Sequence, residues 1–226
     1  MLLVIPVLSF IGDGGSEKIN GAWVLREGDI THTLVIIDGY HSLSSFNIPA
    51  KRFIQTQGGP VRVDGDMLIF DMEYDTADSS NVGSTHACSF QLKGDKLGTY
   101  LNGKDEAWTR TDNGSGALAG NWRITGRMQN GQLVQMRPGA RKTIKLLSGK
   151  RFQWAAINTE TGQFFGTGGG TYTFENGKYT EHIEFFSRDS SRVGMSLSFD
   201  GKVDGRNWHH SGKSSKGDPI DEVWSR

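Results

Sequence analysis

The hexapeptide Asp221-Glu222-Val223-Trp224-Ser225-Arg226 repeats, almost unchanged, the earlier stretch Asp105-Glu106-Ala107-Trp108-Thr109-Arg110. A second landmark recurs in the same order, since Gly21-Ala22-Trp23 returns as Gly120-Asn121-Trp122. Each copy thus begins with Gly-x-Trp and ends with Trp-x-Arg. Self-similarity over such a long period indicates two consecutive structural units rather than one large domain.

These landmarks place the first unit at residues 19–111 and the second at residues 117–226 of the 226-residue chain. The stretch that joins them, residues 111–116, consists of Thr, Asp, Asn, Gly and Ser, the composition of a flexible connector. Because this connector is so short, we expect the two units to be close neighbours.

Residues 1–18 form a separate N-terminal segment with an apolar run from Leu2 to Ile11. The run has the length of a signal-peptide core and is too short to span a bilayer as a helix. No Lys or Arg precedes it, and Gly12-Asp13-Gly14-Gly15 is a poor cleavage site. We interpret the segment as the remnant of an export signal, with a loosely packed apolar arm as the alternative. No other stretch is apolar enough for a membrane helix, so we expect no transmembrane segment.

Short strands and tight turns dominate both units. The chain contains 31 Gly and 12 Phe and has no long helical periodicity, which is typical of an all-β protein. Leu197 and Phe199 alternate with serines, as in a half-buried strand. Hairpin turns are predicted at Asn176-Gly177 and Asp200-Gly201. The strand-like runs of the second unit lie at residues 121–128, 142–147, 151–157, 169–174, 178–186, 193–199, 207–211 and 219–224.

Strands that follow one another through hairpins leave no exposed edge if the sheet closes on itself. We therefore predict an all-β fold made of two tandem antiparallel up-and-down β-barrels, each with about eight strands.

Charge and cysteine content exclude several functional classes. Lys plus Arg and Asp plus Glu number 25 each, so no global attraction to nucleic acid or to anionic lipid is expected. The single cysteine, Cys88, permits no intramolecular disulfide and no multi-cysteine metal site. Its expected role is that of a small apolar residue.

The pairing of Gly-x-Trp on a first strand with Arg at the end of the last strand resembles the pattern of lipocalins, and it occurs twice. The resemblance implies that Arg110 lies across Trp23, and Arg226 across Trp122, closing one end of each barrel through cation-π contact. The stretches 168–173, 179–186 and 221–224 resemble lipocalin-like (calycin) bacterial proteins of Bacteroidetes type, often described only as membrane or secreted proteins. This resemblance implies a protein that is secreted, periplasmic or associated with the cell envelope.

A barrel of eight strands is just wide enough to be filled by its own side chains or to hold one small ligand. Both outcomes remain open at this point, because the second unit has more aromatic and polar residues than closure requires. The candidate ligand-binding residues are Arg141, Trp154, Tyr172, Glu181, His182, Trp208 and His210.

Glu181 is the most informative of these candidates. It shares a strand face with Tyr179 and Ile183, so it projects among apolar neighbours if that face is internal. A buried carboxylate requires a partner, and Arg141 or Lys145 can serve. If the opposite face is internal, His182 and Glu184 point inward instead. The sequence leaves the two faces undecided.

Metal, cofactor and catalytic sites are not indicated. His209 and His210 are adjacent on a strand and therefore point to opposite faces, which prevents them from sharing one metal ion. Haem binding through a single histidine is a minor alternative. Glu181 and Glu184 also lie on opposite faces, so they do not form a facing carboxylate pair. The Gly166–Gly170 run leads into a strand rather than a helix, which favours close backbone packing over a phosphate loop.

We therefore expect a binding protein rather than an enzyme, without cofactor or metal, for a small apolar or amphipathic ligand held in the second barrel. The alternative is an envelope interaction module with solid barrels that binds a glycan or protein partner through loops or an inter-barrel groove. The sequence identifies neither the ligand nor the oligomeric state.

Overall fold

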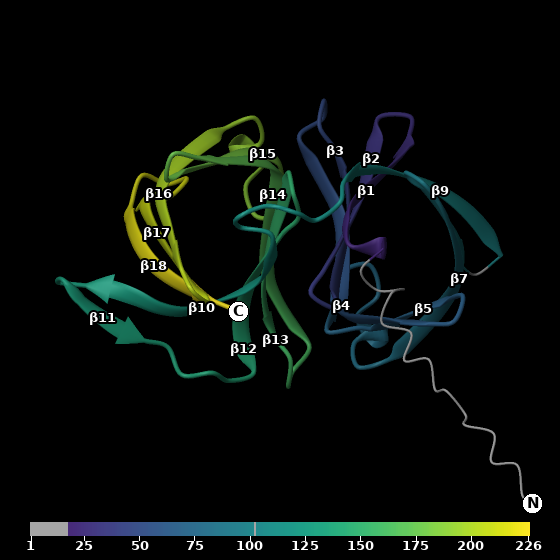
Figure 1. Ribbon diagram of the computed structural model, residues 1–226, viewed down its shortest axis with the longest axis horizontal. Helices are drawn as coiled ribbons and strands as arrows, with labels where there is room; N and C mark the ends of the chain where they lie inside the picture. The colour runs from purple at the N-terminus through teal and green to yellow at the C-terminus, as the bar shows by residue number, and fades with distance from the viewer. Residues whose placement is uncertain (1–17, 102) are drawn as a thin grey trace, which may run out of the picture.

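The computed structural model describes residues 18–101 and 103–226, and it consists of two closed antiparallel barrels side by side (Figure 1). Each barrel contains eight strands joined mainly by hairpins. The prediction of two tandem barrels is confirmed, and the architecture fits a tandem lipocalin-like fold. Most of the predicted N-terminal apolar segment, residues 1–17, lies outside the described residues.

Barrel 1 runs in chain order around its sheet and closes where the third and fourth strands pair. A short extra strand, β6, pairs with β4 outside this ring. A 3-10 turn, η1 (Ser79–Asn81), follows it. The strands are β1 (Gly21–Glu27), β2 (Ile30–Ile37), β3 (Tyr40–Asn47), β4 (Arg52–Asp64), β5 (Met67–Asp71), β6 (Tyr74–Asp75), β7 (Thr85–Lys93), β8 (Lys96–Leu101) and β9 (Lys104–Asp112).

Barrel 2 repeats this plan and closes through the pairing of β10 with β18. Its extra strand, β11, pairs with β10 and extends away from both barrels (Figure 1). The 3-10 turn η2 (Ser190–Arg192) corresponds to η1. The strands are β10 (Gly120–Gln129), β11 (Gln132–Gln135), β12 (Arg141–Leu147), β13 (Arg151–Asn158), β14 (Gln163–Glu175), β15 (Lys178–Phe186), β16 (Ser196–Asp204), β17 (Asn207–Lys213) and β18 (Pro219–Ser225).

One strand in each barrel passes so close to its neighbour that only glycine fits. In β14 the register shifts at Gly169/Gly170, and a Cβ on Gly170 would lie 2.0 Å from the His182 carbonyl oxygen. In β4 a Cβ on Gly59 would lie 1.9 Å from the Asp71 carbonyl oxygen. The glycine-rich run of the second unit therefore serves close backbone packing, where a strand bends around the barrel.

A third apolar core lies between the barrels, in addition to the core inside each. It joins outward-facing side chains of β2 and β3 to those of β12 and β13, and Phe164 packs against it. The barrels are therefore held together by a packed interface. The buried residues of this interface are Ala22, Val35, Ile37, Tyr40, Tyr74, Ile144, Leu146, Ala155 and Ile157.

Polar contacts fix the position of one barrel against the other. The buried amide of Gln153 accepts a hydrogen bond from Ser44 Oγ at 3.0 Å and donates to Thr56 Oγ1 at 2.9 Å. Phe46 stacks on Phe185 with ring centroids 4.6 Å apart. Because buried amides and hydroxyls lose stability when unpaired, these contacts specify a single arrangement of the interface.

The predicted connector is ordered by Asp112. Its carboxylate accepts hydrogen bonds from Ser148 Oγ and from the backbone N–H groups of Gly149 and Lys150, at 2.7–3.0 Å. The composition of residues 111–116 suggested a flexible linker, but the second barrel holds its first residues in place.

Two local predictions for strands were wrong. Asp200 and Gly201, predicted as a hairpin turn, lie inside β16, and the chain turns at Gly205 instead. The run predicted to start at residue 193 starts as strand at Ser196, because Val193 caps η2.

No helix among the described residues combines the length and the apolar character needed to cross a bilayer.

Candidate functional site

Each barrel is closed at one end by the same contacts: an arginine lies over a tryptophan ring, and each of these two side chains donates to a backbone carbonyl. In barrel 1, the Arg110 guanidinium carbon lies 4.0 Å from the centre of the Trp23 ring, and Trp23 donates to the Ile19 carbonyl at 2.9 Å. In barrel 2, Arg226 lies 4.5 Å from the Trp122 ring, and Trp122 donates to the Leu118 carbonyl at 2.8 Å. Each arginine also donates to a carbonyl of the segment before the first strand.

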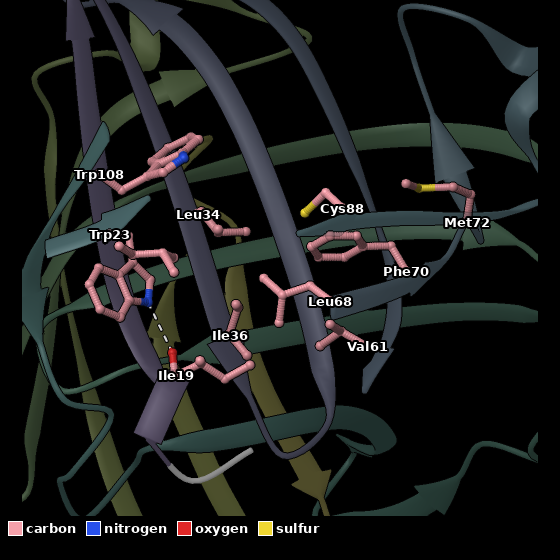
Figure 2. Close-up of a cluster of buried hydrophobic side chains, with 11 residues drawn as sticks. Ile19, Trp23, Leu34, Ile36, Val61, Leu68, Phe70, Met72, Cys88 and Trp108 are labelled. Carbon is pink, nitrogen blue, oxygen red and sulfur yellow. Dashed lines mark hydrogen bonds between the residues drawn. The ribbon is translucent and has the colours of Figure 1, made fainter. Parts of the chain in front are cut away.

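Barrel 1 is largely filled by its own side chains. Figure 2 shows Trp23 with its bond to Ile19, and Leu34, Phe70 and Cys88 beside one another in the same core. The remaining cavity is about 140 Å³. Such a space holds a few water molecules, given about 30 Å³ for each in the liquid.

His41 is a buried imidazole at the edge of that cavity. Its Nδ1 lies 2.8 Å from the Gly59 carbonyl oxygen, which requires the proton on Nδ1. Burial lowers the pKa of His41 to about 4, so the ring is neutral at physiological pH. Nε2 has no hydrogen-bond partner among the described residues.

Barrel 2 contains a larger cavity of about 280 Å³. It opens at the end of barrel 2 opposite the one that Trp122 closes, where β15 ends and β18 begins. Two groups of side chains line it, a mainly apolar wall and a charged floor. The wall is formed by Thr143, Trp154, Ile183, Phe186, Leu197 and Ile220, and the floor by Lys145, Glu181, His210 and Glu222.

An ion pair between Lys145 and Glu181 occupies the centre of the floor. Lys145 Nζ lies 2.8 Å from Glu181 Oε1, and both side chains are less than a tenth exposed. Tyr179 donates to the same carboxylate oxygen at 2.9 Å, and its pKa is raised by burial and by the Glu181 charge. The strand face that carries Glu181 is therefore the internal one, with Lys145 as its partner.

Aromatic rings surround the Lys145 ammonium. Its nitrogen lies between 5.2 and 5.9 Å from the ring centres of Phe152, Tyr179, Trp208 and Trp224. Ring faces attract a cation at this range, most strongly when water is excluded. The aromatic core below the cavity thus contributes to holding the charge in place.

Glu222 forms the other half of the floor. Its Oε1 lies 3.6 Å from Arg127 Nε, and its Oε2 accepts a hydrogen bond from Trp224 at 3.2 Å. Burial alone would raise the pKa of Glu222, but the neighbouring His210 and the charges of Lys145 and Arg127 outweigh it and keep the pKa low. The carboxyl is therefore ionised near neutral pH.

His210 adds a neutral ring to the floor. Burial lowers its pKa, and its Nδ1 lies 3.7 Å from Glu222 Oε2, longer than a hydrogen bond. With His210 neutral, the floor residues comprise one cation, Lys145, and two anions, Glu181 and Glu222. Lys145 pairs with Glu181, and Arg127, an exposed residue outside the cavity, compensates the charge of Glu222.

The structure brings three of the predicted ligand-binding candidates together at the cavity: Trp154, Glu181 and His210. Two others lie beneath the floor. Trp208 is fully buried in the aromatic core, and Tyr172 donates from its hydroxyl to the Ser148 carbonyl at 2.6 Å.

The remaining two candidates lie outside the cavity. His182 is exposed and its ring pairs with Ser196 Oγ, because it occupies the outer face of β15. Arg141 is exposed at the start of β12 and lies over the Phe165 ring. Neither side chain contributes to the cavity.

Most of the residues that line the cavity were not among the sequence candidates, including Phe186, Leu197, Ile220 and Glu222. Glu222 belongs to the repeated hexapeptide, which was interpreted only as a closure element. The alternation in residues 193–199 already placed Leu197 on an internal face, so that signal was present in the sequence.

An open groove also lies between the barrels. It is formed by η1 and the loop after it on one side, and by the hairpin at residues 159–162 on the other. None of the described residues that form it is a deeply buried charged group, so it offers less for a small ligand than the barrel 2 cavity.

No protein-family model matches the chain, and a search of curated proteins gives no significant match.

Proposed function

We propose that this protein binds a small amphipathic molecule in the cavity of barrel 2, with an uncharged polar end at the floor and an apolar body against the wall. The observation that carries the proposal is the separation of the cavity into an apolar wall and a polar floor whose two carboxylates are each paired, Glu181 with Lys145 in the floor and Glu222 with Arg127 outside the cavity. Ligand sites commonly combine a largely apolar lining with a few convergent polar groups.

The charge of the floor selects the polar end. A ligand carboxylate or ammonium placed there would add an unpaired charge to a buried, balanced set, which is costly in a poorly solvated site. A hydroxyl or amide adds no charge and can donate a hydrogen bond to Glu222, whose side chain remains 14 % exposed. We therefore expect an alcohol or amide to bind more tightly than an acid or amine of equal chain length.

The size of the cavity limits the ligand. At about 280 Å³ it lies just below the range typical of small-molecule pockets, roughly 300–1,000 Å³. A compact molecule fits entirely, whereas a long acyl chain would extend through the open end. Contact with Trp154 on the wall provides a fluorescence signal for either.

The test is titration with an alkyl alcohol, carboxylate and amine of equal length, followed by tryptophan fluorescence and calorimetry. Leu197→Trp fills the barrel 2 cavity and should weaken alcohol binding at least about tenfold, through overpacking. Leu43→Trp, at the barrel 1 cavity, is the matched control and should leave the affinity unchanged. Absence of binding by all three compounds, or equal loss in both variants, would overturn the proposal.

A further inference from the structure

The hairpin formed by β10 and β11 has an unusual surface. Among the six large apolar side chains that are most exposed in the described residues, three lie here: Leu133 at 46 %, Val134 at 45 % and Met136 at 42 %. β11 is the last strand of its sheet, and all four of its residues are exposed. The hairpin extends away from both barrels (Figure 1). Apolar side chains so placed contribute nothing to a core.

The base of the hairpin is nevertheless well anchored. The backbone N–H of Met136 donates to the Thr125 carbonyl at 2.8 Å, and Arg123 donates to the Gly139 carbonyl at 2.7 Å. Leu133 lies opposite Met128 and Val134 opposite Arg127, so both faces of the ribbon carry an apolar residue.

Charge is strongly segregated around this hairpin. No Asp or Glu occurs between Asp112 and Glu160, although the chain as a whole has no net charge. Arg127 is partly compensated by Glu222 of the adjacent β18. Arg137 and Arg141, in the segment that returns to the barrel, are exposed. Exposed apolar residues bordered by arginines complement a surface whose outer layer is anionic and whose interior is apolar.

We propose that the β10–β11 hairpin docks this protein on an anionic phospholipid surface. Leu133, Val134 and Met136 enter the interface between headgroups and acyl chains, and Arg137 and Arg141 contact the lipid phosphates. Trp122 lies near the start of β10 and the hairpin at its end, so the hairpin leaves barrel 2 from the end of the strand that is far from the closed end. The proposal is independent of the ligand inferred for that barrel.

Cosedimentation with vesicles tests the docking directly. The protein should bind vesicles of phosphatidylcholine mixed with phosphatidylglycerol, bind phosphatidylcholine alone weakly, and dissociate as ionic strength rises. Replacing Arg137 and Arg141 by Gln should lower the partition coefficient about fivefold for each arginine, following the contribution of roughly 1 kcal/mol for each basic residue.

The apolar contribution is tested by the triple variant Leu133→Ser, Val134→Ser and Met136→Ser, which should reduce binding at least about tenfold. Ile48→Ser and Ile54→Ser, at exposed apolar positions of barrel 1, are the matched controls and should bind like the unmodified protein. Unchanged thermal unfolding of each variant establishes that the fold is intact.

Equal binding to both vesicle types, or full binding by the triple variant, would overturn the proposal. Analytical ultracentrifugation provides a further outcome. A concentration-dependent dimer that the triple variant abolishes, without lipid binding, would assign the hairpin to contact with a second copy and refute membrane docking.

Discussion

Lys145 Nζ and Glu181 Oε1 lie 2.8 Å apart inside barrel 2, on strands that are not neighbours in the sheet. The pair therefore spans the interior of the barrel. Two charges at this depth incur a desolvation cost that a well-packed apolar pair would not. The proposed function would account for their presence, since paired charges below the cavity can orient a polar ligand group.

Removing one partner of this pair should be much more harmful than removing both. Lys145→Met leaves the Glu181 carboxylate buried without a counter-charge, and we expect the free energy of unfolding to fall by about 3–5 kcal/mol. Urea unfolding measures this loss.

The double variant Lys145→Met/Glu181→Leu is the control, and it should regain most of the lost stability because no unpaired charge remains. If the single and double variants are equally unstable, the ion pair is not what stabilises this part of the barrel.

His41 should make barrel 1 sensitive to acid. Its pKa is about 4 in the folded protein, lowered by burial, against about 6.5 in the unfolded chain. Because the unfolded chain binds the proton more tightly, stability is fully present above pH 6.5 and falls as the pH decreases toward 4. The difference in pKa corresponds to about 3 kcal/mol over this range.

Unfolding by urea between pH 4 and pH 7 measures this dependence, and His41→Phe should flatten it by about one proton. His209→Gln, at an exposed position, is the matched control. An imidazole NMR titration that gives His41 an ordinary pKa would contradict the prediction.

The two barrels were predictable because their closure is encoded locally. Trp23 and Trp122 each bond to a carbonyl four residues earlier, and each is covered by the arginine that ends the repeated hexapeptide. Short-range contacts of this kind leave a recognisable sequence pattern. A further repeat was available, since Asp78-Ser79-Ser80-Asn81-Val82-Gly83 returns as Asp189-Ser190-Ser191-Arg192-Val193-Gly194 and forms η1 and η2.

The core between the barrels was not predicted, because it depends on the outer faces of strands. Leu34-Val35-Ile36-Ile37 is a continuous apolar run rather than an alternating one, which indicates burial on both faces. The run could have been noticed, but nothing in it identifies the strands on the other side.

The partner of Glu181 was also beyond sequence analysis, which left Arg141 and Lys145 as alternatives. Both residues are on β12, four positions apart, so strand alternation places their side chains on the same face. Depth in the barrel decides between them, since Arg141 lies at the exposed end and Lys145 in the interior. Depth depends on the tilt and register of eight strands together.

Alanine substitution should be severe at the two close-packed glycines. Gly59→Ala and Gly170→Ala place a Cβ 1.9 and 2.0 Å from a backbone oxygen of the neighbouring strand, so the strands must separate. We expect each change to lower the free energy of unfolding by about 3 kcal/mol. Gly139→Ala is the matched control, because its Cβ meets no atom within 4 Å, and its effect should stay within about 0.5 kcal/mol. Equal effects at all three positions in urea unfolding would show that close packing is not the reason for Gly59 and Gly170.

Cys88 offers a probe of how tightly barrel 1 is closed, since it is the only cysteine in the chain. Burial, together with the Glu106 carboxylate, raises its pKa to about 11, so almost no reactive thiolate is present at pH 8. We expect a thiol reagent to label the folded protein at least about a hundredfold more slowly than the protein in urea. Glu106→Gln removes the neighbouring negative charge and should increase the rate moderately, whereas Cys88→Ser should abolish labelling. A folded protein that reacts as fast as the unfolded chain would show that barrel 1 opens freely, which its filled core opposes.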